Sequence, residues 1–350
     1  MMTKVYVGMS GGVDSSLTAA LLKEQGYDVT GVYMKNWTQD LPGMRCPWAD
    51  DLADAKRVAV QLGIDFKVFD FEKEYKQKVV DYMINEYKLG RTPNPDIMCN
   101  QEVKFKLFLE TALDDGADLI ATGHYARVKD GVLKQAVDTN KDQTYFLYRV
   151  TGEALKNTLF PLGEFTKPEV RKMAEERGLY TAAKKDSQGI CFVGQIGIRE
   201  FLSQYVEEKA GSIIDKQTGK ILGQHDGAIF YTVGQRHGLE VGGGLPYYVV
   251  GKDMDKNDVY VTTDLNDENL WKPELGLVGV HWINGAPENG TYQIRVRHRA
   301  TLTDAELILD GETARLILKH PERAVAAGQS VVIYSGEDCL GGGIVSPLSV

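Results

Sequence analysis

The 350-residue sequence contains few cysteines and no long apolar segment. Its four cysteines form no Cys-x-x-Cys pair, which disfavours both a secreted disulfide scaffold and a zinc site. The N-terminus lacks a signal-peptide pattern, and no apolar run approaches the roughly 20 residues that span a bilayer. We therefore expect a cytoplasmic protein, in which any cysteine that matters does so through its chemistry.

An excess of positive charge is also missing. The net charge is -9 at pH 7, with 25% charged and 43% hydrophobic residues. A protein that binds nucleic acid over most of its surface needs Lys and Arg for the phosphates, so the net charge argues against that class, although it does not exclude a local basic track. The composition and length are typical of a globular protein of two or three domains.

The first half of the chain alternates predicted strands and helices, as a parallel sheet requires. Strands are expected at residues 5–9, 29–34, 66–69 and 119–122, and helices at 15–25, 51–62, 74–88, 102–113, 168–177 and 198–205. A ligand is expected beyond the carboxyl ends of those strands.

The stretch SGGVDSS connects the first expected strand to the first helix. Gly11 and Gly12 permit a close approach of the backbone, and Ser15 is placed to cap the helix, whose first amides bind anions. No lysine follows the glycines, so a Walker loop is disfavoured, and an ordinary strand-to-helix turn is the plain alternative. With Asp14 and the serines, the stretch resembles the loop of enzymes that split ATP between its α and β phosphates. Met34, at the end of the second strand, is placed equally well to touch adenine or to fill the core.

Two further segments carry candidate chemistry. In RTPNPDIMCN, two prolines hold Asn94 and Asp96 in an extended loop before Cys99. A structural proline loop with a small buried cysteine is favoured from this segment alone. In KKDSQGICF, nearby lysines favour a thiolate at Cys191, against the alternative of a buried cysteine in a strand. Whether Cys99 and Cys191 meet depends on the fold.

From about residue 211 the sequence becomes rich in short β runs separated by turns. The runs AIFYTV, YYVVG, DVYVTT, YQIRVRH and SVVIYS predict one or two antiparallel units in the form of small barrels. In YQIRVRHRAT, strict alternation predicts Arg295, Arg297 and Arg299 on one strand face, with a solvated charged face as the plain interpretation.

Eight motifs in this order resemble the bacterial tRNA-specific 2-thiouridylase family. They are SGGVDSS, MKNW, GRTPNPDIMCN, TGHYAR, KDQTYFL, FPLG, DSQGICF and YTVGQRHGL. The resemblance implies an α/β fold: an N-terminal parallel-sheet PP-loop ATPase domain, similar to adenine nucleotide alpha hydrolases, followed by small β-rich or β-barrel domains. It divides the chain into residues 1–207 for ATP binding and catalysis, 208–272 for a central β-rich domain, and 273–350 for a C-terminal barrel.

The family resemblance also implies a reaction and its residues. ATP, with Mg²⁺ near Asp14, would adenylate the C2 oxygen of the tRNA wobble uridine, and sulfur would replace it. Asn94, Pro95 and Asp96 would meet the target base, with Asp96 as the acid/base group. The implied ATP contacts are Gly8, Met9, Ser10, Gly11, Gly12, Val13, Asp14, Ser15, Met34 and Gly123.

The same resemblance assigns roles to two cysteines and implies a tRNA footprint. Cys191 would carry a persulfide supplied by a cysteine desulfurase or a sulfur-relay protein, and Cys99 would attack or resolve it, leaving a transient Cys99–Cys191 disulfide. Cys46 and Cys339 match no motif and are expected to be structural. The implied tRNA contacts are Lys141, Asp142, Gln143, Arg297, His298 and Arg299.

Some features depart from the family or leave alternatives. Gly194, Gln195 and Ile196 replace a usual Gly-Glu-Arg stretch, and His298 replaces a tyrosine, which puts contacts to tRNA or sulfur donor in doubt. Other enzymes with this loop, such as argininosuccinate synthetase, GMP synthetase or tRNA 4-thiouridine synthase, are alternatives, as is a non-catalytic tRNA-binding or redox-sensing protein. The sequence does not fix the oligomeric state, for which a monomer is the expectation.

Overall fold

The first half of the chain folds around a five-stranded parallel sheet. A computed structural model describes residues 2–40, 46–185, 197–242 and 244–346. The sheet order is β3-β2-β1-β4-β7, and every pair in it is parallel. Its strands are β1 (Lys4–Gly8), β2 (Asp28–Lys35), β3 (Asp65–Asp70), β4 (Leu119–Ala121) and β7 (Thr158–Leu159). The four strands predicted in this half are confirmed.

The strand order reverses between β1 and β4, because β2 and β3 lie on one side of β1 while β4 and β7 lie on the other. Ligands in open α/β sheets bind at this switch point, outside the carboxyl ends of the strands. The loops that follow β1 and β4 therefore face each other at the expected ligand position.

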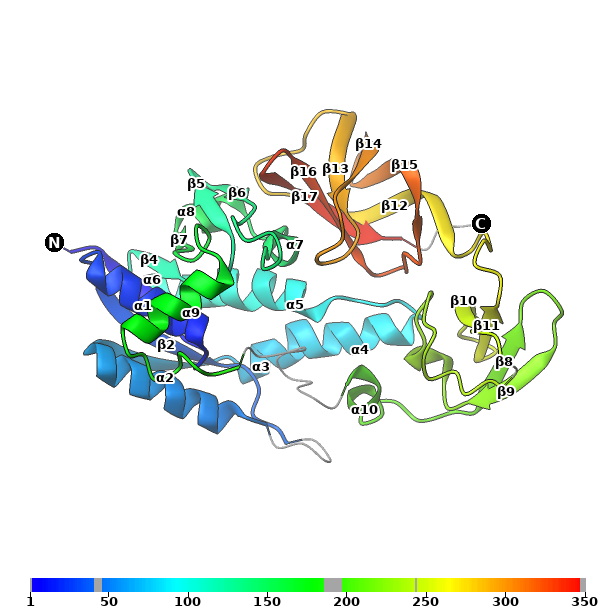
Figure 1. The fold of residues 1–350 in the computed structure, drawn as a ribbon, viewed down its shortest axis with the longest axis horizontal. Coiled ribbons are helices and arrows are strands. Elements are labelled where there is room, and N and C mark those ends of the chain that lie inside the picture. Colours follow the sequence, from blue (N-terminus) through cyan, green and yellow to red (C-terminus); the bar gives the residue numbers. More distant parts are fainter. Residues whose placement is uncertain (1, 41–45, 186–196, 243, 347–350) are drawn as a thin grey trace.

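Helices cover both faces of this sheet (Figure 1). Val5 and Val7 pack with residues of the first two helices, whereas Tyr6 points to the opposite face, as the alternation of a strand requires. The helices are α1 (Val13–Glu24), α2 (Trp48–Leu62), α3 (Glu72–Tyr75), α4 (Asp81–Lys88), α5 (Pro95–Met98), α6 (Phe108–Asp114), α7 (Thr144–Leu147), α8 (Gly152–Lys156), α9 (Lys167–Glu176) and α10 (Ile198–Leu202). Among the described helices, none is long and apolar enough to cross a membrane.

Two of the predicted helices are interrupted by wider turns. The run from α3 to α4 contains a π-helical segment at Lys76–Val80, and the run from α5 to α6 contains another at Cys99–Leu107. Such segments are rare and occur frequently at functional sites. The second begins at one of the two cysteines singled out by the sequence.

A closed six-stranded barrel occupies the C-terminal part of the chain (Figure 1). Its strands run β12-β15-β14-β13-β16-β17, and β17 pairs back with β12. They are β12 (Trp271–Trp282), β13 (Gly290–Arg295), β14 (Thr303–Asp310), β15 (Thr313–Arg323), β16 (Ser330–Ser335) and β17 (Asp338–Val345). A hairpin from the first half, β5 (Arg127–Lys129) and β6 (Val132–Lys134), extends this sheet through β17. The expected fold class is confirmed.

A smaller sheet lies between the two larger units in sequence, in the order β10-β11-β8-β9. The strands are β8 (Gly211–Asp215), β9 (Ile221–His225), β10 (Tyr248–Asp253) and β11 (Asp258–Thr262). The strand expected in AIFYTV is wrong, because Ala228–Phe230 forms a 3-10 turn. There the Ala228 amide donates to the Asn257 side chain at 2.8 Å, so it makes no strand ladder bond.

The strict alternation expected in YQIRVRHRAT is also wrong beyond Arg295, where β13 ends. Arg295 is buried and donates to the carboxylate of Asp142 at 2.8 Å. Its neighbours Ile294 and Val296 are buried as well, and Arg299 has a left-handed backbone with φ of 64°. Arg295 therefore belongs to the interior, and only Arg297 and Arg299 of the three arginines are exposed.

Candidate active site

The loop between β1 and α1 has a backbone that glycine makes possible. Gly11 has a φ of 73°, and a Cβ added to it would lie 2.3 Å from the Asp51 carbonyl oxygen. Any other residue there would therefore collide with α2 in addition to adopting a strained conformation. The loop is therefore held close to α2.

The serines of the loop make hydrogen bonds within the loop and the first turn of α1, and none of their side chains caps the helix. The helix begins at Val13 after Gly12, so Ser15 lies in the first turn and the cap predicted for it is wrong. The Ser15 hydroxyl accepts from the Ser10 amide at 3.1 Å, and the Ser16 hydroxyl donates to the Gly12 carbonyl at 2.8 Å. Amides and hydroxyls are thus gathered at one helix N-terminus, an arrangement that favours a bound anion.

Gly8, Met34 and Gly123 meet at the carboxyl ends of neighbouring strands. A Cβ added to Gly8 would lie 3.0 Å from the Met34 Cε atom. A Cβ added to Gly123 would lie 2.9 Å from the Ser15 amide nitrogen and from the Asp14 carbonyl carbon. The structure therefore brings the predicted nucleotide residues together across the switch point of the sheet.

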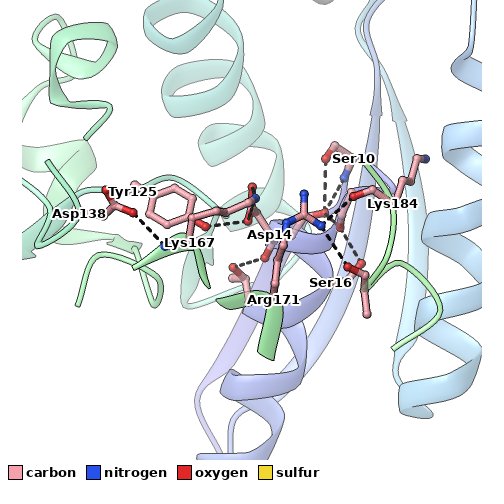
Figure 2. Close-up of polar contacts among 12 residues, drawn as sticks. Ser10, Asp14, Ser16, Tyr125, Asp138, Lys167, Arg171 and Lys184 are labelled. Atoms are coloured by element: carbon pink, nitrogen blue, oxygen red, sulfur yellow. Dashed lines mark hydrogen bonds and ion pairs between the residues drawn. The ribbon is translucent and has the colours of Figure 1, made fainter. Parts of the chain in front are cut away.

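Asp14 lies at the centre of a polar cluster that the sequence interpretation did not include (Figure 2). Its carboxylate accepts hydrogen bonds from the Tyr125 hydroxyl at 2.9 Å and from the Lys167 ammonium at 2.7 and 2.8 Å. Magnesium is typically bound by one or two carboxylates together with phosphate oxygens, and Asp14 offers one such carboxylate. The Asp14 carboxylate is thus a type of ligand that suits magnesium, but both of its oxygens already accept hydrogen bonds from Lys167.

Two more cations approach the loop, from α9 and from the chain after it (Figure 2). Arg171 donates to the carbonyl oxygens of Ala182 and Lys184 at 3.1 and 3.0 Å. The Lys184 ammonium bonds Asp51 at 2.8 Å and Asp54 at 2.7 Å, both on α2.

A sequence signal for part of this cluster was present. Thr166 and Glu169 form a capping box, which fixes Lys167 as the first residue of α9. Arg171 follows four residues later, on the same helix face.

The PNPD segment forms a capped helix start. The Asn94 side chain accepts from the amides of Asp96 and Ile97 at 3.1 and 3.3 Å, and so fixes the first turn of α5. Burial raises the pKa of Asp96, and the Lys104 ammonium partly offsets this effect. A carboxyl with a raised pKa can hold a proton for general acid catalysis.

Cys99 lies one turn inside the helical run that starts at Pro95 and is 3% exposed. Cys191 lies outside the described residues, as do Gly194, Gln195 and Ile196, so the pairing of the two cysteines is not tested. Cys46 and Cys339 are buried thiols, and burial raises the pKa of both.

The predicted tRNA residues separate into buried and accessible groups. Asp142 is 1% exposed and bonded to Arg295, so a direct contact of its side chain with tRNA does not fit this structure. Gln143 accepts from the Tyr125 amide at 2.8 Å, and Lys141 is partly buried. The His298 ring packs 4.6 Å from that of Phe146, and burial and then Arg299 lower its pKa to about 4. His298 is therefore neutral at pH 7.

Family models match nearly the whole chain. They are described as a tRNA methyl transferase HUP domain at residues 3–195, a tRNA methyl transferase PRC-barrel domain at 199–263 and an aminomethyltransferase beta-barrel domain at 273–345. The chain is 47% identical over 351 residues to the tRNA-specific 2-thiouridylase MnmA of Bacillus anthracis, with 98% of this chain and 94% of the relative covered. It belongs to the tRNA-specific 2-thiouridylase family. The MnmA protein of Bacillus mycoides gives the same identity and coverage.

Solved structures show more distant likenesses to this 2-thiouridylase family member. The U34-tRNA thiolase NcsA from Methanococcus maripaludis is 18% identical, with a TM-score of 0.38, and 58% of this chain and 63% of that chain are covered. A 4-thiouridine synthetase in complex with RNA and ATP is 19% identical, with a TM-score of 0.38 and coverage of 58% and 50%. The family assignment rests on the sequence relatives and not on these structures.

Proposed function

We propose that this protein is an ATP-dependent tRNA 2-thiouridylase. The observation that carries the proposal is the 47% identity to 2-thiouridylases over 98% of the chain, together with a loop at the sheet switch point that suits a phosphate anion. The family models carry methyl transferase names, but a loop for splitting ATP suits adenylation of the substrate, which methyl transfer does not require. Whole-chain identity also favours 2-thiouridylation over the other PP-loop reactions.

In the proposed first step, the C2 oxygen of the wobble uridine attacks the α-phosphate of ATP, and pyrophosphate leaves. The amides after Gly12 and the hydroxyls of Ser10 and Ser15 would hold the leaving pyrophosphate, while Met34 and Gly123 line the adenosine side. The remaining proposed contacts are Gly8, Met9, Gly11 and Val13. Magnesium, held by Asp14 and the phosphates, would neutralise charge on the pyrophosphate.

The proposed second step replaces the adenylated oxygen by sulfur. The terminal sulfur of a Cys191 persulfide attacks C2, and AMP leaves with the oxygen. The Cys99 thiolate then attacks the inner sulfur of Cys191, which leaves one sulfur on C2 and forms a disulfide that an external dithiol reduces. Asn94 and Pro95 would place the base, and Asp96 would supply or accept the proton.

The proposal includes a division of labour between the parts of the chain. Residues 1–207 would bind ATP and carry the chemistry, whereas 208–272 and 273–350 would help to hold tRNA. Lys141, Gln143, Arg297, His298 and Arg299 are the proposed tRNA contacts, and a cysteine desulfurase or relay protein is the sulfur donor. A monomer located in the cytoplasm, where tRNA and ATP are present, completes the proposal.

The test is thiolation of purified tRNA with ATP, Mg²⁺, a desulfurase, cysteine and a reductant, read by mass spectrometry of the nucleosides. The wild-type protein is expected to form 2-thiouridine, and Cys191→Ser and Cys99→Ser are expected to form none. If the wild-type protein consumes ATP without tRNA and forms no thiouridine, the loop serves another substrate and the proposal is wrong.

A further inference from the structure

The Lys167–Asp14 ion pair stands where the triphosphate of the proposed function would bind (Figure 2). Lys167 itself is 8% exposed, and its ammonium bonds both oxygens of Asp14 at 2.7 and 2.8 Å. Asp14 is the second residue of α1, so its backbone belongs to the same helix start that presents amides to the ligand. The Lys167 ammonium and the proposed phosphate site therefore lie next to each other at the start of α1.

The two partners are not buried to the same degree. The side chain of Lys167 is 10% exposed, but that of Asp14 is 32% exposed. An unneutralised carboxylate at the mouth of this loop would repel a triphosphate, because like charges a few ångströms apart disfavour each other even in a partly solvated site. A nearby cation is thus needed at Asp14 before the anion can bind.

A hydrogen bond, a capping box and helix packing fix the backbone of Lys167, whereas its side chain extends to the loop. The Lys167 amide donates to Asp138 at 2.9 Å, and the capping box of Thr166 and Glu169 holds the helix start. Val170 and Ala174 of α9 pack with Val13 and Leu17 of α1. Because the lysine stem is long and flexible, its ammonium can change partner without movement of the helix.

We propose that Lys167 is a phosphate-binding residue that changes partners during the reaction. Without ATP its ammonium neutralises Asp14. When ATP binds together with Mg²⁺, the metal would neutralise Asp14 and the ammonium moves to oxygens of the β- and γ-phosphates. As the bond from the α-phosphorus to the bridging oxygen breaks, the electron pair stays on the pyrophosphate, and the Lys167 ammonium stabilises that added charge. The inference rests on the proposed use of ATP and adds a residue to it.

The test compares ATP affinity in four proteins by calorimetry at a fixed MgCl₂ concentration: wild type, Lys167→Met, Asp14→Asn and the double variant. A charge-assisted contact predicts that Lys167→Met weakens ATP binding about 10- to 100-fold. Lys172→Met is the matched control, because Lys172 lies on the same helix with its side chain 76% exposed, and its ATP affinity is expected to equal that of the wild type.

The deciding comparison is between Asp14→Asn and the double variant. If Lys167 binds phosphate, its removal still weakens ATP binding about 10-fold or more when no carboxylate is present at residue 14. Equal ATP affinity in these two proteins would mean that Lys167 only neutralises Asp14, and would overturn the inference. The double variant lacks both charges, so it keeps the comparison valid if Lys167→Met alone unfolds, which thermal melts would show.

Failure of the inference is distinguishable from failure of the proposed function. Wild-type protein that thiolates tRNA, with no effect of Lys167→Met in the Asp14→Asn background, overturns the role of Lys167 alone. Wild-type protein that neither binds ATP nor thiolates tRNA overturns both.

Discussion

The nucleotide loop and the junction between the catalytic sheet and the barrel are built in opposite ways. In the loop, the turn from Ser10 to Ser16 is one contiguous segment closed by bonds between residues at most five positions apart, although the Asp14 side chain also bonds the distant Tyr125 and Lys167. The junction includes an ion pair between Asp142 and Arg295, which are 153 positions apart. Short segments with fixed local geometry leave a motif in the sequence, whereas distant pairs leave none.

The PNPD segment, residues 93–96, combines local contacts with contacts to distant parts of the chain. Asn94 caps its own helix start locally, but the preceding Thr92 amide bonds the Ala327 carbonyl of the barrel part at 2.8 Å. The Thr92 hydroxyl also lies 3.1 Å from that of Thr232 in the central part. A local motif is thus held in place by both later parts of the chain. We therefore expect changes within the motif to act mainly on activity, and changes in its distant contacts to act mainly on stability.

Asp96→Asn should give the largest loss of activity. Removal of a positioned acid/base group typically costs about 10²- to 10⁴-fold in rate, so tRNA thiolation should fall by that factor while ATP affinity is unchanged. If Asp96 acts as an acid, the wild-type rate should also fall as the pH rises through its raised pKa. Thiolation at the wild-type rate would remove Asp96 from the mechanism.

The same variant gives a stability test with a definite sign. The pKa of Asp96 is raised above its usual value, so ionisation disfavours the folded protein. At a pH below the unfolded pKa both states are protonated and no penalty exists. The melting temperature of the wild type should drop relative to Asp96→Asn as the pH rises from the unfolded to the folded pKa, and the gap should then stay constant.

Gly11→Ala should disrupt the nucleotide loop, which is the contiguous region of the two. Its Cβ would lie 2.3 Å from the Asp51 oxygen, and a displacement of about 1 Å in a site can cost about 100-fold in rate. Pyrophosphate release should fall by at least that factor. Gly26→Ala is the control, because Gly26 also has a positive φ, 88°, but no atom lies within 4 Å of its added Cβ; equal losses in both variants would contradict the steric account.

The extent of sequence-based prediction follows the same division. The parallel strands were predictable, because strand periodicity is a local pattern, whereas the convergence of Gly8, Met34 and Gly123 was implied by the family resemblance. The burial of Arg295 was not, since alternation along a strand cannot show that the chain leaves it after that residue. Lys167 was missed for a related reason: a helix start far along the chain reaches Asp14 only through packing of α9 on α1.

Arg295→Met should destabilise the junction between the sheet and the barrel, where the paired residues are distant in sequence. Removing one partner of a buried ion pair typically costs about 3–5 kcal/mol, because the carboxylate of Asp142 would remain buried without its cation. Urea unfolding should show this loss in the free energy of unfolding. The double variant Asp142→Asn with Arg295→Met should recover much of it; a double variant as unstable as the sum of both single changes would contradict coupling between the two residues.

Arg297→Ala should give the smallest effect and sharpen the boundary between interior and surface at the end of β13. Arg297 is exposed and bonds the carbonyls of Arg323 and Ala324, so its loss should barely change stability. If it contacts a tRNA phosphate, the slope of log affinity against log salt should fall by about 0.7–0.9, with a several-fold weaker affinity at moderate salt. Arg315, an exposed arginine on β15, is the matched control, and Arg315→Ala should leave the slope unchanged. Equal slopes in Arg297→Ala and the wild type would place this arginine outside the tRNA footprint, because a lost phosphate contact must release fewer counterions on binding.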